Sequence, residues 1–370
     1  MKLLLYTVGF AGVGYLFAYF FQIENVHNSA LYNLLVASLL AIGLYGSTYS
    51  INVQELRQNL RIVLSAVTIG VFLKILFIGT VLYLFQQNNI SFLYGVIVAQ
   101  IDPLSVAALV KDSRFSKKAK TILSAWSSFD DPMTVIASLY IATLVVGDGT
   151  GNATSVVGNT SSIQEYFMNL GSNLLFVLVI YLLYVGGRYA YAHWLSRPSQ
   201  KQTRPTTIPS NSANHLLTYG LLLVSLFTSV AYSLMLGIAS IGLFLRPPIE
   251  HVIQFITKIS LYVSVFLLGI LLIGGVQLYM GFFVAIATIS AQIVVGFLLT
   301  FGLPLKDRFQ LALAQQNGVT AITLALIFEP RYGSIVAVIA PAILFINLLH
   351  VVFNGLLDRF DAHLFQTEES

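Results

Sequence analysis

Two adjacent carboxylates, Asp130 and Asp131, stand in the middle of a long apolar run, within the stretch SSFDDPMT. A third, Asp102, precedes Pro103 in another apolar run, VIVAQIDPLSVAALV. In hydrocarbon, burial and a neighbouring carboxylate both disfavour ionisation, so the pair should take up protons as one coupled unit. Such a site can hold a proton or, once deprotonated, a bare cation. Competition between these two ligands for one carboxylate is the least that an exchange of ions requires.

The two adjacent aspartates cannot be equivalent, because neighbouring residues of a helix point about 100° apart. We predict that Asp131 is the main ligand of the cation and that Asp130 assists it. Ser127 and Ser128 lie one helical turn before Asp131, and Thr134 lies one turn after it. Residues at this spacing share a face of a helix, so their hydroxyls are predicted to support the site.

A second polar interruption occurs late in the chain, in LALAQQNGVTAITLAL. There Gln315, Gln316, Asn317 and Gly318 break an apolar run at its middle. If the halves of the chain fold as inverted repeats, this break and the one at Asp102 meet at the membrane midplane and direct half-helix ends toward one site. The plainer alternatives are a proline kink in the first run and helix packing through glycine in the second.

The composition requires lipid as the solvent of most of the chain. Of its 370 residues 57% are hydrophobic and 9% are charged, against about 25% charged in soluble domains. The net charge of +4 comes from basic residues scattered over short loops, which is not the pattern of a nucleic-acid-binding protein. Cysteine is absent, which excludes thiolate chemistry, and we expect no cofactor.

A helix that crosses a bilayer needs about 20 mainly apolar residues. This length predicts about twelve spans, of which the eighth is short. They lie near 2–21, 28–49, 60–85, 92–110, 118–146, 166–193, 214–231, 234–246, 250–274, 277–302, 307–328 and 332–356.

The basic residues predict the orientation of these spans. With the N-terminus inside, every Lys and Arg except Lys74, Lys258 and Arg331 falls on the inner side. Since basic residues concentrate in cytoplasmic loops, both termini are predicted to be cytoplasmic, in the cell (plasma or inner) membrane.

The predicted fold is therefore an all-α polytopic membrane protein with two inverted six-helix repeats and broken crossing helices 4 and 11. The predicted parts are a first repeat (1–195), a cytoplasmic linker (196–213), a second repeat (214–356) and a short cytoplasmic tail (357–370).

At these residues the chain resembles the monovalent cation/proton antiporter superfamily, the sodium/proton exchangers and their relatives. Many members carry a Thr-Asp-Pro helix before a helix with an Asn-Asp or Asp-Asp pair. Here Ile101-Asp102-Pro103 precedes Asp130-Asp131. The segment 43–75 is similar to the second and third core helices of the family, and NGVTAITLAL (317–326) is similar to its later broken helix.

The resemblance implies a secondary antiporter, not an enzyme. Such a protein exchanges a monovalent cation, sodium foremost with potassium or lithium as alternatives, for H⁺ by alternating access in the lipid bilayer. It also implies a homodimer whose core domain carries the ion in an elevator-like motion. By resemblance, Asp131 is the ion-binding aspartate, Asp130 the residue that precedes it, and Asp102 the aspartate of the unwound helix.

Two departures from the family pattern concern charge and hydroxyl groups at the site. Ile101 replaces the usual threonine, and Gln292 stands where relatives carry Lys or Arg. Lys74 lies near the centre of the third span, which an inverted repeat relates to the tenth. We expect Lys74 to supply the charge that Gln292 lacks; the alternative is a lysine facing a wet cavity or carbonyls of its own helix.

Three alternatives remain at this level. A cation channel or potassium-efflux protein is disfavoured because no TVGYG-type filter is present. An intramembrane enzyme of the kind that binds diphosphates on Asp-rich motifs would need a second Asp-rich cluster in the spans, and the sequence has none. A non-transporting homologue of the same fold is compatible with the departures at Ile101 and Gln292.

Overall fold

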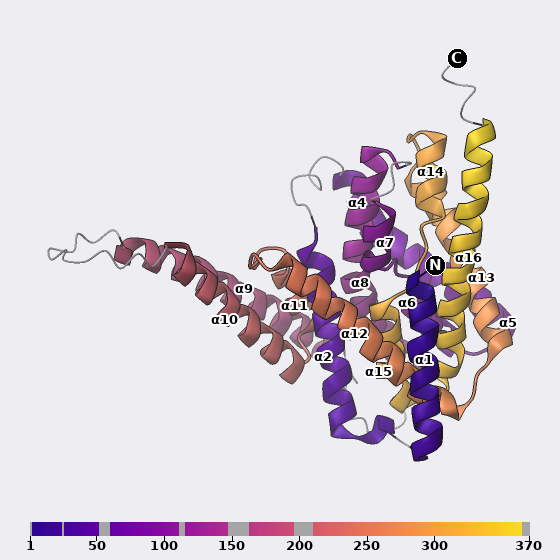
Figure 1. Cartoon of the computed structure of the whole chain (residues 1–370), viewed down its shortest axis with the longest axis horizontal. Helices are drawn as coiled ribbons and strands as arrows, with labels where there is room; N and C mark the ends of the chain where they lie inside the picture. Colours follow the sequence, from indigo (N-terminus) through magenta and orange to yellow (C-terminus); the bar gives the residue numbers. More distant parts are fainter. Residues whose placement is uncertain are drawn as a thin grey trace.

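The computed structural model describes residues 2–23, 26–51, 60–110, 115–146, 163–195 and 210–364. Within these ranges every regular element is helical, as expected for spans that must satisfy their backbone groups internally (Figure 1). Seven of the described helices are long and apolar enough to cross a membrane. The chain is thus an all-α, multi-pass membrane protein. Most of the predicted linker (196–209) and the end of the predicted tail (365–370) lie outside the described residues.

The first half of the chain follows the predicted spans to within a few residues at each end. Its helices are α1 (Lys2–Phe21), α2 (Ala30–Tyr49), α4 (Leu60–Ser65), α5 (Val71–Gln86), α6 (Ile90–Val98), α7 (Pro103–Leu109), α8 (Lys117–Val146) and α9 (Ile163–Leu195). A π-helical turn (Ala66–Gly70) joins α4 to α5, so these three pieces form one span. The fourth predicted span is broken between α6 and α7, as expected.

The second half contains the second predicted break, between α14 and α15. Its helices are α10 (Ser210–Ala231), α11 (Met235–Ile241), α12 (Glu250–Leu271), α13 (Leu278–Leu299), α14 (Leu305–Ala312), α15 (Val319–Tyr332) and α16 (Ile335–Leu364). Helix α10 begins inside the predicted linker (196–213), and α16 continues into the predicted tail (357–370).

The eighth predicted span, 234–246, does not form a membrane-long helix. Helix α11 has seven residues and rises about 10 Å, a third of the hydrocarbon thickness. Beyond it the chain runs without regular structure into Pro247 and Pro248, which disfavour helix continuation. Tyr45 donates a hydrogen bond to the Leu245 carbonyl at 2.7 Å, which ties this segment to α2. The count of twelve spans stays a prediction.

Helix α1 packs closely along α12 because small residues face each other. A Cβ added at Gly14 would collide with the backbone of Phe266, and one added at Gly269 would collide with the backbone of Ala11. Helix α2 contacts α11, α12 and α15, while α5, α6, α8, α13 and α16 pack around the two breaks. Helices α9 and α10 extend side by side away from the main bundle (Figure 1).

Candidate functional site

The two unwound segments, 99–102 and 313–318, meet and bond directly to each other. The backbone N–H of Asp102 donates to the Gln316 carbonyl at 2.9 Å. The Gln315 amide donates to the carbonyls of Val98 and Gln100, at 3.1 and 2.7 Å. The Val98 carbonyl ends α6 and the Gln100 carbonyl lies in the unwound segment, so neither has a partner within a helix. The second break therefore completes the hydrogen bonding of the first. Asn317, at 3.1 Å from the Val98 carbonyl, adds to it.

Asp102 acts as the N-cap of α7. Its Oδ2 accepts hydrogen bonds from the backbone N–H of Ser105 at 2.8 Å and from the Ser105 hydroxyl at 2.7 Å, and Pro103 occupies the first helical position. Gly318 lies directly against this carboxylate, because a Cβ there would collide with it. The backbone of Val319, at the start of α15, also interacts with Asp102. One carboxylate thus faces the positive ends of two half-helices.

Asp130 is paired with the lysine that the sequence singled out. The Lys74 ammonium lies 2.8 Å from Asp130 Oδ2, and both side chains are buried. The same oxygen accepts the backbone N–H of Ile101 at 3.2 Å. The ammonium also lies 5.4 Å from the centre of the Trp126 ring, a cation–π contact. The buried charge on Asp130 is therefore balanced from α5, and the Ile101 side chain packs away with Trp126 in a buried apolar cluster.

Asp131 has a different environment from its neighbour. It is buried, and no ion pair reaches it among the described residues. Its Oδ1 makes no hydrogen bond in the described structure, and neither does the Oδ1 of Asp130. Thr320 of α15 lies beside it, with its hydroxyl close enough to interact with the carboxylate but outside regular hydrogen-bond geometry. Asp102 is close enough to Asp131 for the two carboxylates to repel each other. Oxygen atoms are the ligands that hard cations prefer, so this cluster can coordinate a cation or hold a proton.

The hydroxyls predicted to support Asp131 bond to main-chain carbonyls of α8 instead. Ser127 and Ser128 both donate to the Ser124 carbonyl, at 3.2 and 2.7 Å. Thr134 bonds the carbonyl of Asp131 at 2.9 Å, and also the Gln100 side chain at 3.0 Å. Serine and threonine in a helix readily bond the preceding turn, which explains the difference.

The second break is held by α16, through residues that sequence reasoning missed. The Asn347 side chain bonds both the N–H and the carbonyl of Asn317, at 3.0 and 2.9 Å. His350 contacts the Leu313 carbonyl through Nδ1 at 2.9 Å and the Gln316 amide through Nε2 at 2.8 Å. A neutral imidazole with its proton on Nδ1 satisfies both contacts.

Two further side-chain amides donate hydrogen bonds to carbonyls near the second break. Asn354 also donates to the Leu313 carbonyl, at 3.2 Å. Gln292 of α13 donates to the Leu311 carbonyl at 3.0 Å, near the end of α14. A signal was present in the sequence, because Asn347, His350 and Asn354 recur at helical spacing on one face of an apolar run.

Comparisons with known proteins concern the family and the fold. The family model described as "Sodium/hydrogen exchanger, transmembrane" matches residues 2–358. The solved structure of the sodium proton antiporter MjNhaP1 from Methanocaldococcus jannaschii at pH 8 is similar, with a TM-score of 0.61 and 17% sequence identity. The match covers 96% of this chain and 100% of that one, and at this identity it shows the fold alone. No curated protein sequence matches the chain.

Proposed function

Because the chain belongs to the family of transmembrane sodium/hydrogen exchangers, which are secondary transporters and not enzymes, we propose that it exchanges a monovalent cation for H⁺ by alternating access. Sodium is the first candidate, with potassium and lithium as alternatives. The homologue of similar structure is a sodium proton antiporter, which supports sodium as the first ion to test.

The observation that carries the proposal is the contrast between adjacent carboxylates. The Oδ2 of Asp130 is occupied by the Lys74 ammonium and by the Ile101 N–H, whereas Asp131 has no cationic partner among the described residues and lies beside Thr320. Within the described part of the chain, the Oδ1 of each aspartate is buried without a hydrogen bond, so the difference lies in the second oxygen. We therefore assign the exchange of proton and cation to Asp131. Asp130 with Lys74 sets the local charge, and Asp102 stabilises the half-helix ends.

The geometry also suggests why proton and cation bind in turn. When both Asp131 and Asp102 are ionised, their mutual repulsion is relieved either by a cation between the oxygens or by a proton on one of them. The proton and the cation thus compete to neutralise the same excess of negative charge. Alternating access then requires the helices that carry the site (α5–α8 and α13–α16) to shift against α1, α2 and α12.

We further propose the membrane arrangement expected from the sequence. The distribution of basic residues supports cytoplasmic termini in the cell membrane. The crossing of the two breaks supports inverted repeats at 1–195 and 214–356, joined by a linker at 196–213. A homodimer is expected from the family resemblance.

The test is a dequenching assay in proteoliposomes with an imposed pH gradient, to which sodium, potassium and lithium are added in turn. We expect one of the cations to collapse the gradient with the wild type and none with Asp131→Asn. Ser127→Ala is the matched control, because its hydroxyl bonds only its own helix, and it should transport normally.

Equal activity of the wild type and Asp131→Asn would show that Asp131 is not the residue that exchanges proton and cation. Cation flux without any movement of protons would favour a channel instead.

A further inference from the structure

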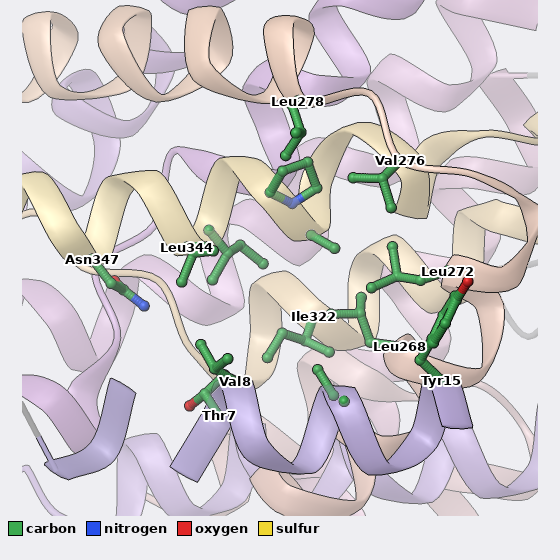
Figure 2. Close-up of a pocket in the computed structure, with 15 residues that line it drawn as sticks. Thr7, Val8, Tyr15, Leu268, Leu272, Val276, Leu278, Ile322, Leu344 and Asn347 are labelled. Atoms are coloured by element: carbon green, nitrogen blue, oxygen red, sulfur yellow. The ribbon is translucent and has the colours of Figure 1, made fainter. Parts of the chain in front are cut away.

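A cavity of about 400 Å³ lies between α1, α12, α15 and α16, outside the ion site (Figure 2). Gly12 and Tyr15 of α1, Leu268 of α12, Ile322 of α15 and Leu344 of α16 are among the residues that line it. None of its lining side chains is charged. The volume falls within the range of about 300–1,000 Å³ that is usual for small-molecule sites.

The chemistry of the lining does not suit a polar ligand. Apart from Thr7, Tyr15 and Asn347, every lining side chain is apolar. The Asn347 amide is already engaged, because it bonds the N–H and the carbonyl of Asn317. Recognition of a polar or charged molecule would leave its groups without partners, at a cost in free energy for each one. Such a lining, with two hydroxyls and otherwise apolar walls, fits an occupant that is mainly apolar.

The surroundings of the cavity indicate the source of such an occupant. Val8, Val276 and Leu278 line the cavity and are also 47%, 48% and 59% exposed, so it is continuous with the outer surface of the bundle. That surface carries large exposed apolar side chains along α1, including Leu5 and Leu16, as expected of helices in contact with hydrocarbon. Phospholipid tails are the apolar molecules that surround such a surface.

We propose that this cavity binds one acyl chain of a membrane phospholipid. A seated chain contacts α1 and α12 on one side and α15 and α16 on the other. Under the proposed function these pairs shift against each other, so the cavity cannot keep its shape through the cycle. A ligand shifts such an equilibrium by its difference in affinity for the two states. The bound chain then stabilises the arrangement described above.

Gly12 offers a substitution that fills the cavity without disturbing the helix. It lines the cavity, and a Cβ added there meets no atom within 4 Å. Gly9, one turn earlier on α1, is equally open but does not line the cavity, so Gly9→Phe is the matched control for Gly12→Phe. Neither position takes part in the close contact of Gly14 with α12.

The experiment uses the full chain in vesicles of phosphatidylethanolamine and phosphatidylglycerol that contain a phospholipid with a diazirine in its acyl chain. After illumination, labelled peptides are mapped by mass spectrometry. We expect labelling of cavity residues of α1 and α16 in the wild type and in Gly9→Phe. In Gly12→Phe it should fall by about tenfold, since a close-packed interior has no room for both the ring and the chain.

Equal labelling of the two variants, label spread evenly over the outward face of α1, or crosslinks to a second copy of the chain would each overturn the proposal. A ring fixed in the cavity cannot leave it, so Gly12→Phe should also slow exchange at least about twofold relative to Gly9→Phe. An unchanged rate would overturn the coupling to transport. Absence of exchange in the wild type would instead overturn the proposed function, and the labelling would still decide on the acyl chain.

Discussion

The two helix breaks meet the same structural need with opposite chemistry. At the first, between α6 and α7, carboxylates hold the free backbone N–H groups: Asp102 caps α7, and Asp130 accepts the Ile101 N–H while paired with Lys74. The free carbonyls there are bonded by amides of the second break. At the second, between α14 and α15, the partners are amides and one imidazole. Asn347 and His350 hold the backbone there without any ion pair among the described residues.

This difference assigns ion exchange to the first break and a purely structural part to the second. A carboxylate can change its charge when it gains a proton or a cation, whereas an amide cannot. The first break, with its carboxylates (the charged break), can therefore respond to pH. The second break, held by amides and an imidazole (the neutral break), keeps its hydrogen bonds unchanged. Three substitutions test this division, with Gly220→Ala and Gln292→Leu as matched controls.

The largest effect is expected where the two breaks touch. In Gly318→Ala the new Cβ would collide with the Asp102 carboxylate, and one or both breaks must shift. A displacement of this order should lower the exchange rate by roughly a hundredfold. Gly220→Ala is the matched control, since its Cβ meets no atom within 4 Å. Normal exchange by Gly318→Ala in proteoliposomes would mean that contact between the breaks is dispensable.

An intermediate effect is expected from Lys74→Gln, which removes the positive charge beside Asp130. Without this charge the neighbouring carboxylates hold protons more tightly, and protons must leave before a cation can bind. The pH of half-maximal exchange should therefore rise by roughly one unit or more. The measurement is the exchange rate as a function of pH.

The neutral counterpart of this variant is Gln292→Leu. It removes a hydrogen bond to the Leu311 carbonyl but no charge, so its pH profile should stay in place. A profile of Lys74→Gln that matches the wild type would show that Lys74 does not set the charge of the site.

The smallest effect is expected at the neutral break. His350→Leu leaves the Leu313 carbonyl with one hydrogen bond fewer and the Gln316 amide without its imidazole partner. The free energy of unfolding should fall by about 1–3 kcal/mol, seen as a lower melting temperature in detergent. The exchange rate should drop modestly with no change in its pH profile. A shifted profile would give the second break a part in the ionic chemistry.

The sequence predicts the breaks and the charges better than the hydrogen bonds around them. Asp102–Pro103 and Gln315–Gly318 mark the two unwound segments, because a carboxylate next to a proline and a run of polar residues each interrupt the apolar pattern of a helix. A proline alone is not enough, since Pro132 and Pro341 lie inside α8 and α16. The repeat argument links Lys74 to the aspartates, and the structure pairs it with Asp130.

The sequence does not show which of several possible partners each polar side chain bonds. The hydroxyls of Ser127 and Ser128 could have faced Asp131 but bond their own helix, and Thr320, from a distant segment, lies there instead. The sequence indicates that the eighth span is short but not that its helix ends at Ile241, since the apolar composition of 234–246 suits a buried turn as well as a helix. The spacing of His350 with Asn347 and Asn354 marks a polar face of α16, but the carbonyl and the amide that His350 contacts are known only from the structure.

The π-helical turn at Ala66–Gly70 has a consequence for the comparison of related sequences. A turn of this kind holds one more residue than an α-helical turn, so it rotates everything after it by about 100° relative to a regular helix. Lys74 lies just beyond it and reaches Asp130 in that rotated frame. A relative lacking one residue here would carry its lysine one place earlier in the chain yet at the same point in space. Alignments of this span are therefore best made separately on the two sides of the turn.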